Sequence, residues 1–306
     1  MTTALHLQNS TPQVGLIGLG AMGNGMAQSL RRANYSPHVI DIRSEVSAAF
    51  AKEGGTACNS LVELGNSCDV IVSVVVNAAQ TESVLFGADG CAATMKPGSV
   101  FVMCSTVDPN WSVALEARLE ALGILYIDAP ISGGAARAAS GQMTMMTAGK
   151  PEAYAIAEPM LKAMAAKVYK LGDSAGAGSK VKIINQLLAG VHIAAAAEAM
   201  ALGLREGVNP DALYEVITNS AGNSWMFENR MAHVLAADYT PLSAVDIFVK
   251  DLGIVLDMAR ATKFPLPLSS TAHQMFMQAS TAGFAKEDDS AVIKIFPGIE
   301  LPKKKI

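Results

Sequence analysis

The stretch that decides the fold reads Val14-Gly15-Leu16-Ile17-Gly18-Leu19-Gly20-Ala21-Met22-Gly23. A short apolar run typical of a strand leads into glycines spaced G-x-G-x-x-G, and a helical pattern follows to Arg32. In this pattern the first glycine allows a tight turn, the second lets a pyrophosphate approach the backbone, and the third permits close helix–strand packing. The helix start adds unpaired N–H groups. The expected cofactor contacts are Gly18, Leu19, Gly20, Ala21, Met22 and Gly23.

An acidic residue ends the second strand-like run, His38-Val39-Ile40-Asp41. A carboxylate at this distance from the glycines accepts hydrogen bonds from the adenosine ribose hydroxyls and repels a 2′-phosphate. Asp41 therefore favours NAD as the cofactor. Arg43 leaves NADP open as an alternative, because a nearby cation can hold that phosphate. Flavin and S-adenosylmethionine proteins share the glycine pattern and are further alternatives.

Strand-like and helix-like segments alternate through the first half of the chain. Strands are expected over 70–76, 99–104, 124–127, 142–147 and 167–171, and helices over 44–53, 109–122 and 152–166. The β-branched run 70–76 is typical of a strand buried on both faces of a parallel sheet. This alternation predicts the α/β class, with an N-terminal Rossmann doubly wound sheet.

Composition changes at the Gly/Ala/Ser-rich segment 172–178, which is typical of a linker. Helical patterns follow over 179–206, 211–219, 244–262 and 268–282, and no strand pattern is seen. We therefore predict an NAD-binding Rossmann domain over 1–175. An all-helical domain for substrate binding and oligomerisation is predicted over 176–306, opening with a long interdomain helix. Because much of the apolar stretch 187–204 must be covered, a homodimer or homotetramer is expected.

Composition excludes several classes of protein. The formal net charge of −4 argues against nucleic acid or an anionic membrane as a partner. The stretch 187–204 carries His192 and Glu198, so it is predicted to be a buried helix with a core histidine rather than a membrane span. The N-terminus lacks a signal-peptide pattern, and the four cysteines lack metal-ligand spacing. We expect a cytoplasmic protein with reduced thiols and no metal site.

Two further segments carry candidate chemistry. Ser132-Gly133-Gly134 offers a hydroxyl and two unshielded backbone N–H groups, which suit a small carboxylate, although an ordinary turn is an alternative. Lys182, Asn185 and Gln186 share one face of the long helix. Burial would depress the lysine pKa from about 10.4 toward neutrality, as a general acid/base requires. A solvated lysine is the alternative interpretation.

These segments resemble the β-hydroxyacid dehydrogenases, a family that includes 3-hydroxyisobutyrate and tartronate semialdehyde enzymes. Four motifs occur in the family's order and span essentially the whole chain: the glycine turn 18–27, the loop 128–134, Gly176-Ala177-Gly178 before Lys182, and Lys250-Asp251-Leu252. Within the family, the segment 224–253 is most similar to bacterial members that oxidise the sugar acid L-threonate.

The resemblance implies roles for individual residues. The family's catalytic lysine falls on Lys182, and its substrate loop on Ser132, Gly133 and Gly134. Many members have Asn four residues after the lysine, where this chain has Gln186, so either Asn185 or Gln186 is expected to contact the substrate. The expected cofactor contacts outside the glycine turn are Asp41, Val75, Val76, Thr106 and Lys250. Val75 and Val76 lie where many members have Met-Leu-Pro, which leaves the turn geometry there open.

The implied reaction is an NAD-dependent oxidation of a short-chain sugar acid, with L-threonate as the expected substrate. Lys182 removes the hydroxyl proton while hydride passes from carbon to the nicotinamide. Within the same class, a 3-hydroxyisobutyrate dehydrogenase or a tartronate or succinic semialdehyde reductase is the alternative. A non-catalytic dinucleotide sensor is the alternative from another class.

Overall fold

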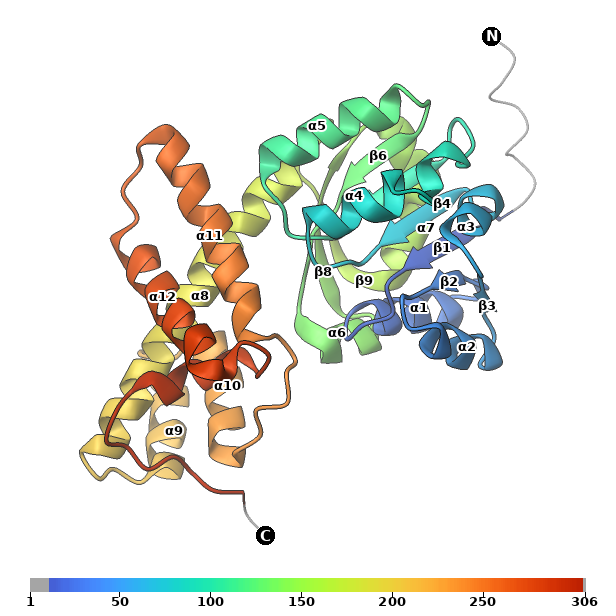
Figure 1. Ribbon diagram of the computed structural model, residues 1–306. Helices are drawn as coiled ribbons and strands as arrows, with labels where there is room; N and C mark the ends of the chain where they lie inside the picture. Colours follow the sequence, from blue (N-terminus) through green and yellow to red (C-terminus); the bar gives the residue numbers. More distant parts are fainter. Residues whose placement is uncertain (1–10, 305–306) are drawn as a thin grey trace. The chain divides into compact units, whose positions relative to one another are not determined.

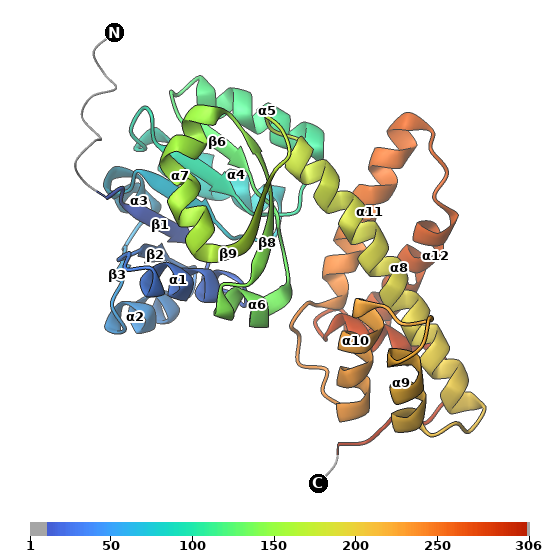
Figure 2. The same cartoon turned by 180° about the vertical axis from the view of Figure 1, so that it is seen from behind.

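The structure is a computed structural model that describes residues 11–304. The chain divides into two compact units, one ending at Lys182 and the other beginning at Ile183 (Figure 1). The first unit is an α/β fold and the second is helical, as the sequence predicts (Figure 2). The first unit ends at Lys182 rather than at residue 175, because the start of the long helix is hydrogen-bonded to it.

The first unit is built on one mostly parallel sheet. Its strands are β1 Val14–Ile17, β2 His38–Ile40, β3 Thr56–Ala57, β4 Val70–Ser73, β5 Val100–Met103, β6 Leu125–Asp128, β7 Ile131–Ser132, β8 Met143–Gly149 and β9 Ala165–Lys170. The strand order is β3-β2-β1-β4-β5-β6-β8-β7, and β9 pairs with β8. β8 runs antiparallel to β6 and to β7. The order reverses between β1 and β4, the switch point at which doubly wound sheets bind dinucleotides.

Helices cover both faces of this sheet. They are α1 Gly23–Arg32, α2 Ser44–Lys52, α3 Leu61–Ser67, α4 Ala78–Phe86, α5 Pro109–Glu120, α6 Gly134–Ser140 and α7 Pro151–Met164. Alternate strand residues point to opposite faces, so Val70 and Val72 join the core under α1 and α7, while Ile71 joins the core under α3, α4 and α5. Figure 1 shows α4 and α5 on one face, and Figure 2 shows α7 on the other.

The second unit packs helices around its own core. They are α8 Ala177–Arg205, of which the part from Ile183 belongs to this unit, α9 Pro210–Thr218, α10 Trp225–Ala236, α11 Val245–Thr262 and α12 Pro267–Ala279. The rings of Phe248 and Phe276 stack with centroids 5.1 Å apart at its centre. A 3₁₀ helix, η3 Asp289–Ile295, completes the core.

Within residues 11–304, α8 is the one helix long and apolar enough to cross a membrane by length and composition. Its residues Ile193, Ala197 and Met200 lie in the core of the second unit, so this part of α8 is a core helix of that unit. His192, predicted to lie in this core, is exposed. That prediction is wrong because the histidine lies on the outer side of the helix, next to the buried Ile193.

The structure also corrects the predicted strand over 70–76, which ends at Ser73. The N–H of Val74 still donates to the carbonyl of Ile17 at 2.8 Å. Beyond it the chain turns into α4, whose N-cap Asn77 accepts from the N–H of Gln80 at 2.9 Å. The sequence pattern did not predict the short elements β3, β7, α3, α4 and α6, or helix α10 of the second unit.

Candidate active site

The glycine turn after β1 has the geometry that a pyrophosphate cradle needs. Gly18 has φ +92°, and a Cβ there would lie 2.9 Å from the carbonyl oxygen of Val74. A Cβ on Gly23 would lie 1.8 Å from the Gly18 oxygen, so the turn closes only with glycine at both positions. A Cβ on Gly20 would meet nothing within 4 Å, which leaves the backbone open there. The N-cap Met22 makes no side-chain cap bond, and the N–H of Asn24 donates to the carbonyl of Gly20 at 3.1 Å, so the turn is closed by its own backbone.

Asp41 at the end of β2 is held as an anion. Its carboxylate accepts from the N–H of Leu19 at 2.7 Å and from the N–H and Nε of Arg43 at 2.9 and 3.0 Å. Burial raises the pKa of Asp41, but these hydrogen bonds outweigh burial and hold its pKa below the usual value. A fixed negative charge therefore lies where the adenosine ribose of NAD binds in this fold.

The loops after β4 and β5 are tied to each other at the same edge of the sheet. Ser105 Oγ donates to the carbonyl of Val75 at 2.7 Å, and the N–H of Val76 donates to Gln80 Oε1 at 2.8 Å. Thr106 follows Ser105 directly and is half-buried. The turn that lacks Met-Leu-Pro thus has a defined geometry, which Ser105 and Gln80 fix. Sequence reasoning named neither of them as a site residue.

The segment 131–134 leaves the sheet through two glycines. Ser132 pairs with Thr144 of β8. Gly133 and Gly134 have φ of +134° and +73°, and a Cβ on Gly134 would meet nothing within 4 Å. Backbone N–H groups in such a turn are accessible to an anion, so the geometry fits the predicted carboxylate site.

Helices α1 and α6 hold the two glycine turns together. A Cβ on Gly25 of α1 would lie 2.5 Å from the N of Ala139, and Ser29 Oγ donates to the carbonyl of Ala138 at 3.2 Å. Each helix starts directly after its glycine turn, at Gly23 and at Gly134. Close packing of the helices therefore fixes the glycine turn 18–23 and the turn 132–134 relative to each other.

Lys182 lies in the second turn of α8 and is 7% exposed. This burial excludes the solvated lysine that periodicity alone left open, whereas Lys180, two residues earlier, is exposed. The first turn of α8 is anchored on Asp128 of β6, which accepts from the N–H groups of Gly176 and Ser179. The lysine and the segment 131–134 are therefore parts of the same compact unit.

The remaining predicted residues gather around one buried carboxylate in the second unit. Asp251, which is 1% exposed, accepts from Gln186 Nε2 at 2.6 Å and pairs with the ammonium group of Lys250. Asn185 Nδ2 donates to Gln186 Oε1 at 3.1 Å. Sequence reasoning quoted Asp251 in a motif but gave it no role, since its 65-residue separation from Gln186 leaves no spacing signal.

The cysteines of the chain are all buried. All four cysteines are free, and burial raises the pKa of each thiol: to about 11 for Cys58, to about 12 for Cys68 and Cys91, and further for Cys104. In the described part of the chain, residues 11–304, no three His, Cys, Asp or Glu side chains are grouped as metal ligands.

Comparison with known proteins gives the family. Residues 13–172 match the family model described as the NAD binding domain of 6-phosphogluconate dehydrogenase, and residues 176–296 match that described as NAD-binding of NADP-dependent 3-hydroxyisobutyrate dehydrogenase. The chain belongs to the NAD-dependent hydroxyacid dehydrogenases. Both matched family models describe NAD-binding domains, which confirms NAD as the predicted cofactor.

Several hydroxyacid dehydrogenases resemble the chain over nearly its whole length. L-threonate dehydrogenase of Cupriavidus necator is 69% identical over 95% of this chain and 98% of that protein. The L-threonate dehydrogenase of Escherichia coli strain K12 is 52% identical over 95% of this chain and 97% of that protein. A crystal structure of 3-hydroxyisobutyrate dehydrogenase from Salmonella typhimurium superposes with a TM-score of 0.89 at 54% identity, covering 93% of this chain and 99% of the other.

Proposed function

We propose that this hydroxyacid dehydrogenase oxidises L-threonate at C2 to the corresponding 2-oxo acid, 2-dehydro-L-erythronate. The observation that carries the proposal is the burial of Lys182, at 7% exposed, on the helix anchored beside the segment 131–134. The choice of substrate rests on the similarity to L-threonate dehydrogenases at 69% and 52% identity.

Each residue has a distinct part in the proposed reaction. The N–H groups of Gly133 and Gly134 and the hydroxyl of Ser132 hold the substrate carboxylate. Lys182 accepts the proton of the C2 hydroxyl, and in the reverse direction it returns a proton to the ketone oxygen. NAD, when bound, accepts the hydride that leaves C2. The substrate therefore loses one proton and one hydride.

The cofactor and second-unit residues complete the assignment. Gly18 to Gly23, Asp41, Val75, Val76 and Thr106 bind NAD in the proposal, together with Lys250. Gln186 has its amide nitrogen on Asp251 and its oxygen on Asn185, so we assign the substrate contact to Asn185. Its carbonyl oxygen can accept from a substrate hydroxyl. The region 1–175 serves as the NAD-binding domain and 176–306 as the domain for substrate and subunit contacts.

A substrate panel tests the proposal. NADH formation is followed by absorbance with L-threonate, D-erythronate, 3-hydroxyisobutyrate and D-glycerate at equal concentrations. We expect kcat/KM for L-threonate to exceed the others by about 10-fold or more, because hydrogen-bonded hydroxyls discriminate more strongly than apolar groups. A preference for 3-hydroxyisobutyrate would instead favour the activity named for the Salmonella relative. Failure of every acid to reduce NAD would favour a dinucleotide sensor.

We also propose a cytoplasmic homo-oligomer. Along α8, Ile184, Leu188 and Leu202 are 54%, 51% and 62% exposed, although all three are large apolar residues. A row of this kind is typical of a subunit interface. A second copy of the chain is the proposed partner for this face.

A further inference from the structure

Asp128 begins the segment that leads to the substrate turn. It is the last residue of β6, pairs with Met103 of β5 and Ala148 of β8, and is fully buried. Four residues later the backbone reaches Ser132. The position of this segment is therefore set at Asp128, where it leaves the parallel sheet.

The side chain of Asp128 holds the start of α8. Its Oδ2 accepts from the N–H groups of Gly176 and Ser179, both at 2.9 Å, and its Oδ1 accepts from Ser179 Oγ at 2.7 Å. Lys182 follows Ser179 by three residues, so the two lie on neighbouring turns of one helical face. One carboxylate therefore fixes the turn directly below the lysine.

The first turn of α8 also packs closely against the sheet at Gly178. A Cβ on Gly178 would lie 2.4 Å from the carbonyl oxygen of Met146 and 2.8 Å from that of Asp128. The helix backbone thus packs closely against the end of β6 and the middle of β8. Gly176 takes φ +98° to bring its N–H onto the carboxylate.

We propose that Asp128 is a positioning residue that sets the distance between Lys182 and the carboxylate-binding turn Ser132-Gly133-Gly134. The backbone of Asp128 begins the segment that ends in this turn. Its side chain is hydrogen-bonded to the first turn of α8, the helix that contains Lys182. The inference rests on the proposed function, because it requires Lys182 as the acid/base. Any acceptor could cap the helix, but only a residue of β6 fixes both groups to one point of the sheet.

Glu116 provides a matched control. It lies on α5, is 9% exposed, and accepts from the N–H of Ala175 with both oxygens at 3.1 Å. It therefore holds the same turn with the same chemistry, but from an element that does not lead to the substrate turn. Substitution of Glu116 should therefore weaken the turn before α8 and leave the connection between Asp128 and the turn 132–134 unchanged.

The experiment compares four variants with the wild type: Asp128→Asn, Ser179→Ala, Glu116→Gln and Lys182→Met. We measure kcat per NADH-binding site, KM for the substrate, the NADH dissociation constant, Tm, and the primary isotope effect with C2-deuterated substrate. Counting kcat per binding site removes any loss that comes from unfolded protein. Asp128→Asn keeps one acceptor oxygen and thus tests position rather than folding.

We expect Asp128→Asn to lower kcat by about 10-fold or more, since misplacement by about 1 Å costs up to about 100-fold. Ser179→Ala should lower kcat by a smaller factor. In both variants KM and the NADH dissociation constant should equal those of the wild type, and the isotope effect should be at least as large as that of the wild type. Glu116→Gln should keep the wild-type kcat even where its Tm falls. A wild-type kcat in Asp128→Asn, or an equal loss in Glu116→Gln, would overturn the inference. Turnover retained by Lys182→Met would instead refute the proposed function.

Discussion

At the scale of single residues, we expect Asp41 and Arg43 to decide the preference between NAD and NADP. Both oxygens of Asp41 are in use, one by the N–H of Leu19 and the other by Arg43. Its pKa lies below the usual value, so the carboxylate is charged at neutral pH and repels a 2′-phosphate. The side chain of Arg43 is half-exposed, and its positive charge is paired with the carboxylate of Asp41.

Replacing the acid should therefore change the cofactor preference. We expect Asp41→Asn to raise the ratio of kcat/KM for NADP to that for NAD by about 10-fold, because it removes the repulsion and frees Arg43 to pair with phosphate. The asparagine oxygen can still accept from Leu19. Steady-state kinetics with both cofactors measures this ratio, and adding Arg43→Ala should abolish the gain. An unchanged ratio in the single variant contradicts the assignment.

Lys182 has an internal comparison two residues away. We expect Lys182→Met to lower kcat by about 10²- to 10⁴-fold, the usual contribution of a general acid/base. The exposed Lys180 has no expected role, and Lys180→Met should retain the wild-type rate. NADH binding, followed by fluorescence, should be the same in both variants. Equal rates for the two substitutions would remove Lys182 from the mechanism.

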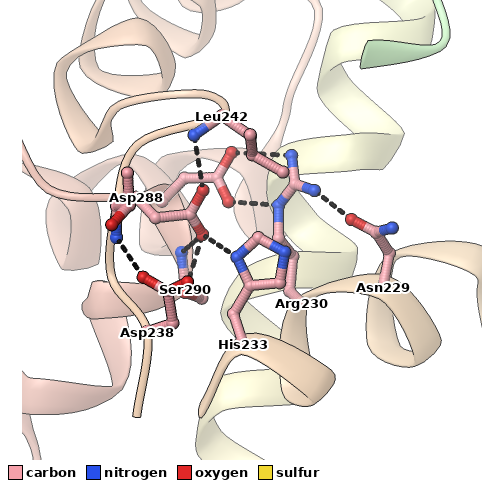
Figure 3. Close-up of polar contacts among 9 residues, drawn as sticks. Asn229, Arg230, His233, Asp238, Leu242, Asp288 and Ser290 are labelled. Carbon is pink, nitrogen blue, oxygen red and sulfur yellow. Dashed lines mark hydrogen bonds and ion pairs between the residues drawn. The ribbon is translucent and has the colours of Figure 1, made fainter. Parts of the chain in front are cut away.

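At the scale of elements, a buried polar cluster connects η3, near the end of the second unit, to α10 (Figure 3). Asp288 accepts from the N–H of Leu242 at 3.1 Å, from Ser290 Oγ at 2.7 Å and from His233 Nδ1 at 3.3 Å. Next to it, Arg230 pairs with the buried Asp289. The cluster joins α10, the chain entering α11, and η3.

This cluster predicts a loss of stability in acid. Burial raises the pKa of Asp288, but hydrogen bonds from His233 and Ser290 and the charge of Arg230 outweigh it and lower the pKa to about 2. Because the pKa of Asp288 is lower in the folded state, its carboxylate stabilises the fold at pH values above 3.8, the pKa of the unfolded state. This stabilisation is lost as the pH falls through the folded-state pKa. We expect Asp288 to account for roughly 2 kcal/mol of unfolding free energy lost between about pH 4 and pH 2.

Urea titrations at several pH values measure this dependence. Asp288→Asn should be less stable than the wild type at neutral pH and should have a flatter profile over the acid range. His233→Gln keeps a hydrogen-bonding side chain without a charge. Its free energy of unfolding at neutral pH should lie between those of the wild type and Asp288→Asn. Parallel acid profiles for the wild type and Asp288→Asn would contradict the attribution.

The elements that the sequence predicted have either a long periodic pattern or an apolar run next to glycines or an acid. β1, α1 and α8 follow directly from apolar runs and glycines. The short helix α3 was missed although Ser60 and Glu63 have capping-box spacing, and Ser60 does accept from the Glu63 N–H. The start of α6 at Gly134 depends on positive φ angles that no pattern of apolar residues reveals.

The site divides in the same way. The glycine turn 18–23 and Asp41 were proposed from local spacing, whereas Lys182 received its proposed role from the resemblance to the family. The roles of Asp128 and Asp251 were not predicted, because their partners lie 48 to 51 and 65 residues away. Such contacts are set by how the elements pack rather than by the sequence near each acid.

At the scale of the whole molecule, the exposed apolar side of α8 predicts self-association. We expect Leu202→Glu to convert the oligomer to smaller species at micromolar concentration, because a buried charge at an interface is costly. Light scattering after size exclusion measures the mass. Phe264→Glu is the matched control, since Phe264 is 65% exposed but lies outside α8. Dissociation by Phe264→Glu alone would place the interface elsewhere.

The four buried thiols have a practical consequence. Oxidants and alkylating agents attack the thiolate, and every cysteine in this chain has a pKa of about 11 or higher. The native protein should therefore withstand peroxide and iodoacetamide that would inactivate an enzyme with a surface thiol. We expect it to keep its turnover when it is purified and stored without a reducing agent.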